Sequence, residues 1–248
     1  MILCLDFDGV IADSINETLV VSTNAYYAKD QSNWIDIDDI DPKIITCFKK
    51  NRYLVAPARD FYVIHRIIET DGYFDRFNTL KADCSSEILD FEKRYFAFRK
   101  FLREEHKQKW LSYHILHKPV EKLIKSFTGD KYIITTKDLQ SVLELCDYWK
   151  ITKFIKAFYT KENLKSKRLA LIDIFRKSDK KWSDFIFVDD NVEYFEEMGD
   201  ISPIKCLALW GYVKPSYIAP PDIKCCSLDE MEPHVFRKIV AAYQNCEI

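Results

Sequence analysis

The chain has 248 residues, of which 48% are hydrophobic and 31% are charged, and its formal net charge is −2. A chain of this length buries roughly 70–75% of its unfolded surface, enough for one α/β core and a smaller lobe. No stretch reaches the roughly 18 apolar residues of a membrane-spanning helix, and the small net charge gives no overall attraction for nucleic acid or an anionic membrane. We therefore expect a globular protein that takes neither nucleic acid nor a membrane as a partner.

Eight cysteines are spread along the chain without a CxxC pair. Only Cys225 and Cys226 are adjacent, and no further metal ligands accompany them. Scattered cysteines in an enzyme-sized chain without a secretion signal are more often reduced than bridged. We therefore expect free thiols and a cytoplasmic location.

The first predicted element is a buried strand at residues 2–5, an apolar run that is too short for a helix and ends abruptly at Asp6. In an open α/β sheet the ligand crevice lies outside the carboxyl ends of the strands, so Asp6 and Asp8 would lie at its mouth. Two carboxylates one residue apart point to the same side of an extended chain. A cation or a shared proton relieves their repulsion, and a magnesium site would supply the cation.

A helical pattern follows over residues 15–27, with Ser14 as its expected N-cap. Residues 30–45 are acidic and broken, which predicts a loop or short turns. Two long amphipathic helices are predicted at 53–70 and 86–113. An insert of about 100 residues without a convincing strand is too large for a loop, so we expect a separate helical lobe.

From residue 118 onward the pattern alternates between helices and strands, which predicts a doubly wound parallel sheet of the α/β class. The predicted strands are 132–135, 154–159, 185–188 and 204–210, and the predicted helices are 120–127, 139–149, 167–177, a short one through Met198, and 232–245. Thr135 ends the first of these strands, and Asp189 and Asp190 follow the third. Because the carboxyl ends of parallel strands meet at one edge, we expect these polar residues to lie near Asp6.

These residues carry a family resemblance. The stretch from Asp6 to Ser14, DFDGVIADS, resembles the first motif of the haloacid dehalogenase-like (HAD) hydrolases, in their phosphoglycolate-phosphatase-like and phosphomutase branch. The resemblance implies a Rossmann-like core made of residues 1–14 and 115–248. It also implies that residues 15–114 form an all-helical cap domain.

The resemblance also implies catalytic roles for individual residues. Asp6 would be the nucleophile that becomes an aspartyl-phosphate, and Asp8 would be the general acid and base. Thr135 would donate its hydroxyl to a phosphate oxygen. A lysine just before the next helix, Lys165 or Lys167, would hold the same phosphate, and we favour Lys165 from its distance to that helix.

Gly9 permits a tight turn close to a phosphate, and Thr136 either contacts the substrate or merely follows Thr135 in the chain. The implied magnesium ligands are Asp6, the backbone carbonyl of Asp8, and Asp190, with Asp189 acting through a water. The usual later acidic residue of this motif falls at Tyr194, with Glu193 beside it. This departure concerns the outer shell of the metal site.

The leading functional hypothesis is a magnesium-dependent phosphatase of a small phosphorylated metabolite. A phosphomutase of the same family shares every core motif, and a degenerate member would bind a phosphorylated ligand without turnover. Four basic side chains of the expected cap either reach a second anionic group of the substrate or are solvated, as helix-borne basic residues usually are: Arg52, Arg59, His65 and Arg66.

Overall fold

The computed structural model describes residues 1–28 and 30–244 and divides the chain into two compact units. The first unit joins Met1–Asp13 to the chain from Leu116 onward, and the second is Ser14–Ile115. Asn245, the expected end of the last helix, and Cys246 lie outside the described residues. No helix within the described ranges is both long and apolar enough to cross a lipid bilayer.

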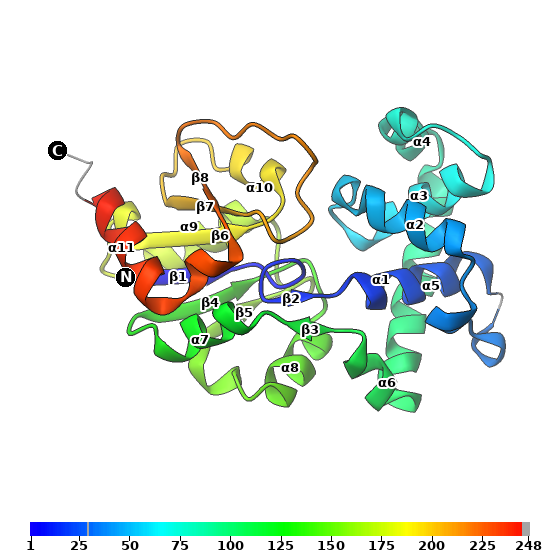
Figure 1. Cartoon of the computed structure of the whole chain (residues 1–248), viewed down its shortest axis with the longest axis horizontal. Helices are drawn as coiled ribbons and strands as arrows, with labels where there is room; N and C mark the ends of the chain where they lie inside the picture. Colours follow the sequence, from blue (N-terminus) through cyan, green and yellow to red (C-terminus); the bar gives the residue numbers. More distant parts are fainter. Residues whose placement is uncertain (29, 245–248) are drawn as a thin grey trace. The chain divides into compact units, whose positions relative to one another are not determined.

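The first unit is built around a parallel sheet with β1 in its interior (Figure 1). Within the described residues the strand order is β5-β4-β1-β6-β7-β8, and every neighbouring pair is parallel. The strands are β1 (Ile2–Leu5), β4 (Asp130–Ile134), β5 (Ala157–Tyr159), β6 (Phe185–Asp189), β7 (Ile204–Ala208) and β8 (Ile223–Cys226). This order confirms the α/β, doubly wound parallel sheet that the sequence predicts.

Helices of the first unit cover this sheet and bury its strands. They are α7 (Lys118–Ser126), α8 (Leu139–Tyr148), α9 (Lys167–Arg176), α10 (Val192–Glu196) and α11 (Pro233–Gln244). All four residues of β1 are at most 1% exposed, as expected for a strand covered on both faces. On one face Cys4 and Phe187 share an apolar cluster with Leu171 of α9. The central strands are therefore rigidly packed up to the point where their polar ends begin.

A short two-stranded sheet, β2 (Ala12–Asp13) with β3 (Ile115–Leu116), accompanies the two points where the chain passes between the units. Just beyond it, the backbone N–H of His117 donates to the carbonyl of Ile11 at 3.0 Å. The place where the chain leaves the first unit and the place where it returns are therefore close together.

The edge strand β8 was not among the predicted strands. Ile223–Cys226 is only four residues long, contains a lysine and follows two prolines, so it lacks the apolar run that marked the other strands. Pairing with β7 supplies its backbone hydrogen-bond partners. Tertiary context, rather than local pattern, makes this segment a strand.

The second unit is a helical insertion, as predicted, but its helix boundaries differ from those expected. The helices are α1 (Ile15–Tyr27), α2 (Pro42–Asn51), α3 (Phe61–Glu69), α4 (Phe77–Asp83), α5 (Ser85–Glu105) and α6 (Lys107–Ser112). Part of the expected loop at 30–45 begins α2, because Pro42 occupies its first turn and the Asp41 carboxylate accepts from the Lys43 N–H. The expected helix at 53–70 is interrupted at Pro57, since the residue before a proline avoids helical angles, and α3 begins at Phe61 after a 3₁₀ turn at Ala58–Asp60.

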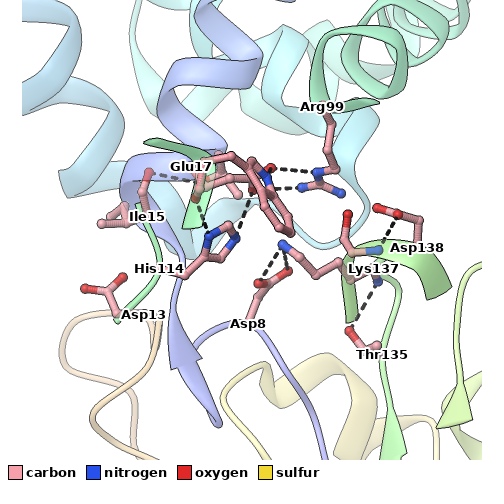
Figure 2. Close-up of polar contacts among 12 residues, drawn as sticks. Asp8, Asp13, Ile15, Glu17, Arg99, His114, Thr135, Lys137 and Asp138 are labelled. Atoms are coloured by element: carbon pink, nitrogen blue, oxygen red, sulfur yellow. Dashed lines mark hydrogen bonds and ion pairs between the residues drawn. The ribbon is translucent and has the colours of Figure 1, made fainter. Parts of the chain in front are cut away.

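A buried ion pair joins α1 to α5 inside the second unit. Arg99 donates from Nε to Glu17 Oε1 at 2.7 Å and from Nη2 to Oε2 at 3.0 Å (Figure 2). The same Nη2 donates to the Tyr95 hydroxyl, and Trp110 Nε1 donates to Glu17 Oε1 at 3.4 Å. Glu17 is fully buried, so this network compensates the cost of taking its charge out of water.

His65 is fully buried in the second unit, with Nε2 2.9 Å from Ser22 Oγ and its ring stacked on Tyr26. Burial lowers the pKa of His65 from 6.5 to about 3. Between these two pH values the unfolded chain binds a proton on this imidazole and the folded chain does not. The contribution of neutral His65 to the free energy of unfolding is therefore complete above about pH 6.5. As the pH falls below that value, this contribution decreases by about 1.4 kcal/mol per pH unit.

Replacing His65 with phenylalanine is expected to reduce the loss of stability at acidic pH. Between pH 6.5 and 4.5 the free energy of unfolding of the wild type should fall about 2–3 kcal/mol further than that of His65→Phe. Urea denaturation at several pH values measures the difference. His234→Phe, at an exposed position, should follow the wild-type curve. Parallel curves for wild type and His65→Phe would contradict the prediction.

Candidate functional site

Three carboxylates meet at the carboxyl edge of the central strands. Asp6 follows β1, whereas Asp189 and Asp190 come at the end of β6, the strand beside β1. The Asp6 N–H donates to the carbonyl of Val188 at 2.9 Å, which extends the pairing of the two strands as far as the site. One carboxylate oxygen from each of the three lies within 4.8 Å of the others, and all three residues are buried. This is the convergence that the sequence predicts from strand topology.

A buried lysine, Lys167, lies among these carboxylates. Its Nζ is 2.7 Å from Asp189 Oδ2 and 3.0 Å from Asp6 Oδ1, and its side chain is 1% exposed. Burial by itself lowers the pKa of Lys167, but the charges of Asp189 and Asp6 outweigh burial and raise it. Lys167 is therefore an ammonium group at neutral pH.

Lys165, which the sequence analysis favoured, is exposed. The helix α9 begins at Lys167, and the Ser166 side chain caps it by accepting from the Leu169 N–H. Lys167, the first residue of α9, is thus the lysine whose ammonium group contacts Asp6. The preference for Lys165 is therefore corrected to Lys167.

Asp189 already has partners for both carboxylate oxygens. Lys167 donates to Oδ2 at 2.7 Å, and the Asn191 N–H donates to Oδ1 at 2.9 Å. Burial raises the pKa of Asp189 well above its usual range, and the nearby charges of Asp6 and Asp190 raise it further, against the opposing effect of Lys167. This arrangement suits a residue that acts on a cation indirectly.

A second buried lysine, Lys137, contacts Asp8. Its Nζ lies 3.1 Å from Oδ1 and 3.4 Å from Oδ2 of that carboxylate (Figure 2). The Lys137 side chain is fully buried, whereas that of Asp8 is 17% exposed. No role was predicted for Lys137, which follows the predicted strand in a Thr-Thr-Lys-Asp turn. Lys137 lies in a bend after β4 rather than in a strand, so no spacing rule in the sequence singles it out.

The charges around this edge match a divalent cation. Asp6, Asp8, Asp189 and Asp190 contribute four carboxylates, and two lysines contribute two ammonium groups, which leaves two negative charges when all are ionised. Asp6 Oδ1 is buried and accepts no hydrogen bond from the described residues, although it lies near Lys167. Carboxylate oxygens are the ligands that Mg²⁺ prefers. The donor set therefore fits a magnesium ion.

Thr135 and Thr136 follow β4, beside β1 in the sheet. The Thr135 N–H donates to the carbonyl of Tyr159 at 2.8 Å, and its Oγ1 accepts from the Lys137 N–H at 3.2 Å. Thr135 is buried and Thr136 is partly exposed. The hydroxyl expected to meet a phosphate thus belongs to the same turn as the lysine that contacts Asp8.

Two glycines allow the chain to pass close to Asp190. Gly9 has φ +86°, and a Cβ placed there would lie 2.1 Å from Asp190 Oδ2. A Cβ on Gly211 would lie 2.4 Å from the Asp190 Cβ. Beside it, the Tyr212 N–H donates to Asp190 Oδ2 at 2.6 Å, and the Tyr212 hydroxyl donates to Asp13 at 2.8 Å. The loop after β7 therefore fixes the orientation of Asp190.

Gly9→Ala is expected to weaken magnesium binding about 10- to 100-fold, because the new methyl group displaces the Asp190 carboxylate. Gly199→Ala is a matched control: Gly199 also has positive φ, at +58°, but the nearest atom to a Cβ placed there would be the Arg168 Nε, at 3.8 Å. Both variants carry the same type of backbone strain. Isothermal titration with Mg²⁺ separates them, and equal affinities would contradict the prediction.

Tyr194 stands where the resemblance expects a later acidic residue. Its ring centroid lies 4.0 Å from Lys167 Nζ, so it presents an aromatic face to the ammonium group. Burial raises the pKa of the Tyr194 phenol, which is neutral at physiological pH. The adjacent Glu193 is exposed. A cation–π contact therefore takes the place of a carboxylate on this side of Lys167.

Comparison with solved structures finds the same fold over nearly the whole chain. A predicted phosphoglycolate phosphatase from Haemophilus somnus 129pt has a TM-score of 0.65 at 13% identity, with 96% of each chain covered. A predicted phosphatase from Clostridium acetobutylicum has a TM-score of 0.60 at 14% identity, covering 95% of this chain and 98% of that one. A HAD-superfamily hydrolase of subfamily IA from Geobacter sulfurreducens PCA has a TM-score of 0.55 at 11% identity, covering 94% and 95%.

No family model and no curated protein matches the sequence. At 11–14% identity these structural relatives establish the architecture alone, because function depends on the side chains of the site rather than on the fold.

Proposed function

We propose that this chain, which has the fold of the HAD-superfamily hydrolases, is a magnesium-dependent phosphatase that hydrolyses a small phosphomonoester through an aspartyl-phosphate. The observation that carries the proposal is the contact of Asp6 with Lys167 beside the Asp189–Asp190 pair. Phosphoryl transfer requires a nucleophile, positioning and neutralisation of charge on the phosphoryl oxygens. The side chains at this edge offer all three.

Asp6 is the proposed nucleophile, because it follows the central strand β1 and its Oδ1, which accepts no hydrogen bond from the described residues, lies 3.0 Å from the Lys167 ammonium group. A covalent intermediate divides one difficult hydrolysis into two easier steps. Asp8 would protonate the leaving oxygen in the first step and take a proton from water in the second. General acid and base help of this kind contributes about 10²–10⁴-fold.

Phosphate binding is assigned to the turn after β4 and to the start of α9. The Thr135 hydroxyl and the neighbouring Thr136 would hold phosphoryl oxygens, and Gly9 would let the backbone approach them. Lys167 takes the role first given to Lys165, because its ammonium group lies at Asp6. A compact ammonium suits this task as a point charge.

Magnesium would be held by Asp6, the backbone carbonyl of Asp8, and Asp190, with Asp189 acting through a water. When bound, the ion would neutralise charge on the phosphoryl oxygens. The helical unit would then serve as the cap domain, with core and cap divided as 1–14 with 115–248, and 15–114. Selectivity for one phosphorylated metabolite would lie in that cap.

The direct test is phosphate release from p-nitrophenyl phosphate and from a panel of phosphorylated metabolites, with Mg²⁺ and with a chelator. We expect release that requires Mg²⁺ and is lost on chelation. Isomerisation of a sugar phosphate without net phosphate release would identify a phosphomutase instead. Binding of phosphorylated compounds without any turnover across the panel would replace the enzyme assignment with a binding role.

A further inference from the structure

We propose that Lys137 is a positioning residue, which holds the Asp8 carboxylate in place to accept a proton from the water that hydrolyses the aspartyl-phosphate. This inference rests on the proposed function and extends it to one half of the reaction. It assigns a separate lysine to each aspartate of the first motif: Lys167 to Asp6, and Lys137 to Asp8.

The contact has the geometry of a fixed salt bridge. Lys137 Nζ lies 3.1 Å from Oδ1 and 3.4 Å from Oδ2 of Asp8, so it contacts both oxygens of the carboxylate. An exposed ion pair is worth little because water competes for both partners. Here the ammonium group is fully buried, and a lysine in such a place needs its partner.

The backbone around Lys137 is also fixed. Its N–H donates to Thr135 Oγ1 at 3.2 Å, and its carbonyl accepts from the Lys161 N–H at 3.1 Å. The Nζ lies 6.0 Å from the ring centroid of Phe7, the residue between the two aspartates. With both ends of the side chain held, movement of Asp8 away from its place would break its contact with this buried ammonium group.

The geometry assigns this contact to the second half-reaction. In that step the water oxygen bonds to phosphorus and gives one proton to the Asp8 carboxylate. The bond between phosphorus and the Asp6 oxygen breaks, and its electron pair returns to Asp6 as carboxylate. Lys137 gives up no proton in this step and remains an ammonium group. The ion-paired carboxylate is the form of Asp8 that can accept the proton.

Lys137→Met tests the inference with p-nitrophenyl phosphate, whose nitrophenolate leaves without needing a proton. With enzyme in excess, nitrophenolate release in the first turnover should stay within about twofold of wild type. Loss of the phosphoryl group from Asp6, followed by intact mass, should slow about 10- to 100-fold, the usual effect of losing a residue that orients a catalytic group. The aspartyl-phosphate should therefore accumulate.

Lys161→Met, at an exposed neighbouring position, is the matched control and should leave both phases unchanged. If Lys137→Met does not fold, Lys137→Gln, which keeps an N–H donor, is measured in its place. It should likewise release nitrophenolate at the wild-type rate and lose the phosphoryl group more slowly. Equal slowing of both phases indicates a merely structural role and overturns the inference, and so does an unchanged second phase. A wild-type chain that forms no phosphoenzyme overturns the proposed function, and the inference with it.

Discussion

Asp6→Asn is expected to lower kcat/KM for phosphate release by about 10⁴-fold or more while leaving the protein folded. The amide has nearly the same shape as the carboxylate but cannot attack phosphorus, and loss of a covalent nucleophile has effects of this order. The folded state should tolerate the change, because Asp6 lies near two other carboxylates and Lys167 keeps its contact with Asp189. Phosphate release and urea denaturation measure the two effects separately.

Asp200→Asn provides the control for this variant. Asp200 is 83% exposed and pairs with Arg168 at the surface, so its replacement should leave activity within about twofold of wild type. Asp6→Asn should also fail to accumulate a phosphorylated species in intact mass spectra. Activity of Asp6→Asn within tenfold of wild type would remove the aspartyl-phosphate mechanism.

Lys167→Met should be the most damaging single change for stability at the site. It removes the ammonium group that lies 2.7 Å from Asp189 and 3.0 Å from Asp6, and breaking a buried ion pair in this way costs about 3–5 kcal/mol. Activity should fall as well, because in the proposed mechanism Lys167 supplies the positive charge that holds the phosphoryl group. We expect added Mg²⁺ to restore part of the lost stability, since the ion supplies positive charge at the same carboxylates.

The matched variant is Lys165→Met, two residues earlier and exposed. Its free energy of unfolding should remain within about 0.5 kcal/mol of wild type, and its kcat/KM should be nearly unchanged. Urea denaturation with and without Mg²⁺, together with phosphate release, compares the two lysines. A larger effect of Lys165→Met on either quantity would reverse the assignment.

Strand ends were the part of the site that the sequence could predict. Residues 2–5 and 185–188 are apolar runs too short for helices, and each is followed directly by aspartate. Parallel pairing of β1 with β6 then brings Asp6 and Asp190 to one edge without further information. Hydrophobic pattern and the geometry of parallel sheets suffice for this convergence.

The lysines could not be assigned in the same way, because their placement depends on turns. Whether Lys165 or Lys167 faces the carboxylates is decided by where α9 starts, and that depends on the Ser166 cap. Lys137 follows a strand in a polar turn, and only tertiary packing shows that it is buried against Asp8. A long, flexible side chain can reach either solvent or a buried partner from the same backbone position.

The helical unit was predicted in kind but not in detail. Amphipathic periodicity identified its helices, whereas the break at Pro57 and the start at Pro42 moved their boundaries. The pair of Glu17 with Arg99 could not be anticipated, because 82 positions separate them in the sequence. Long-range pairs of this kind are set by packing rather than by local propensity.

The hydrogen bond between Ile11 and His117 means that the sheet-bearing unit is closed on itself where the intervening hundred or so residues leave and return. Exchange of the residues between Ile11 and His117 by recombination would leave every strand of the six-stranded parallel sheet intact. On the proposed function, such an exchange would change the substrate preference while the residues at the strand ends are inherited unchanged.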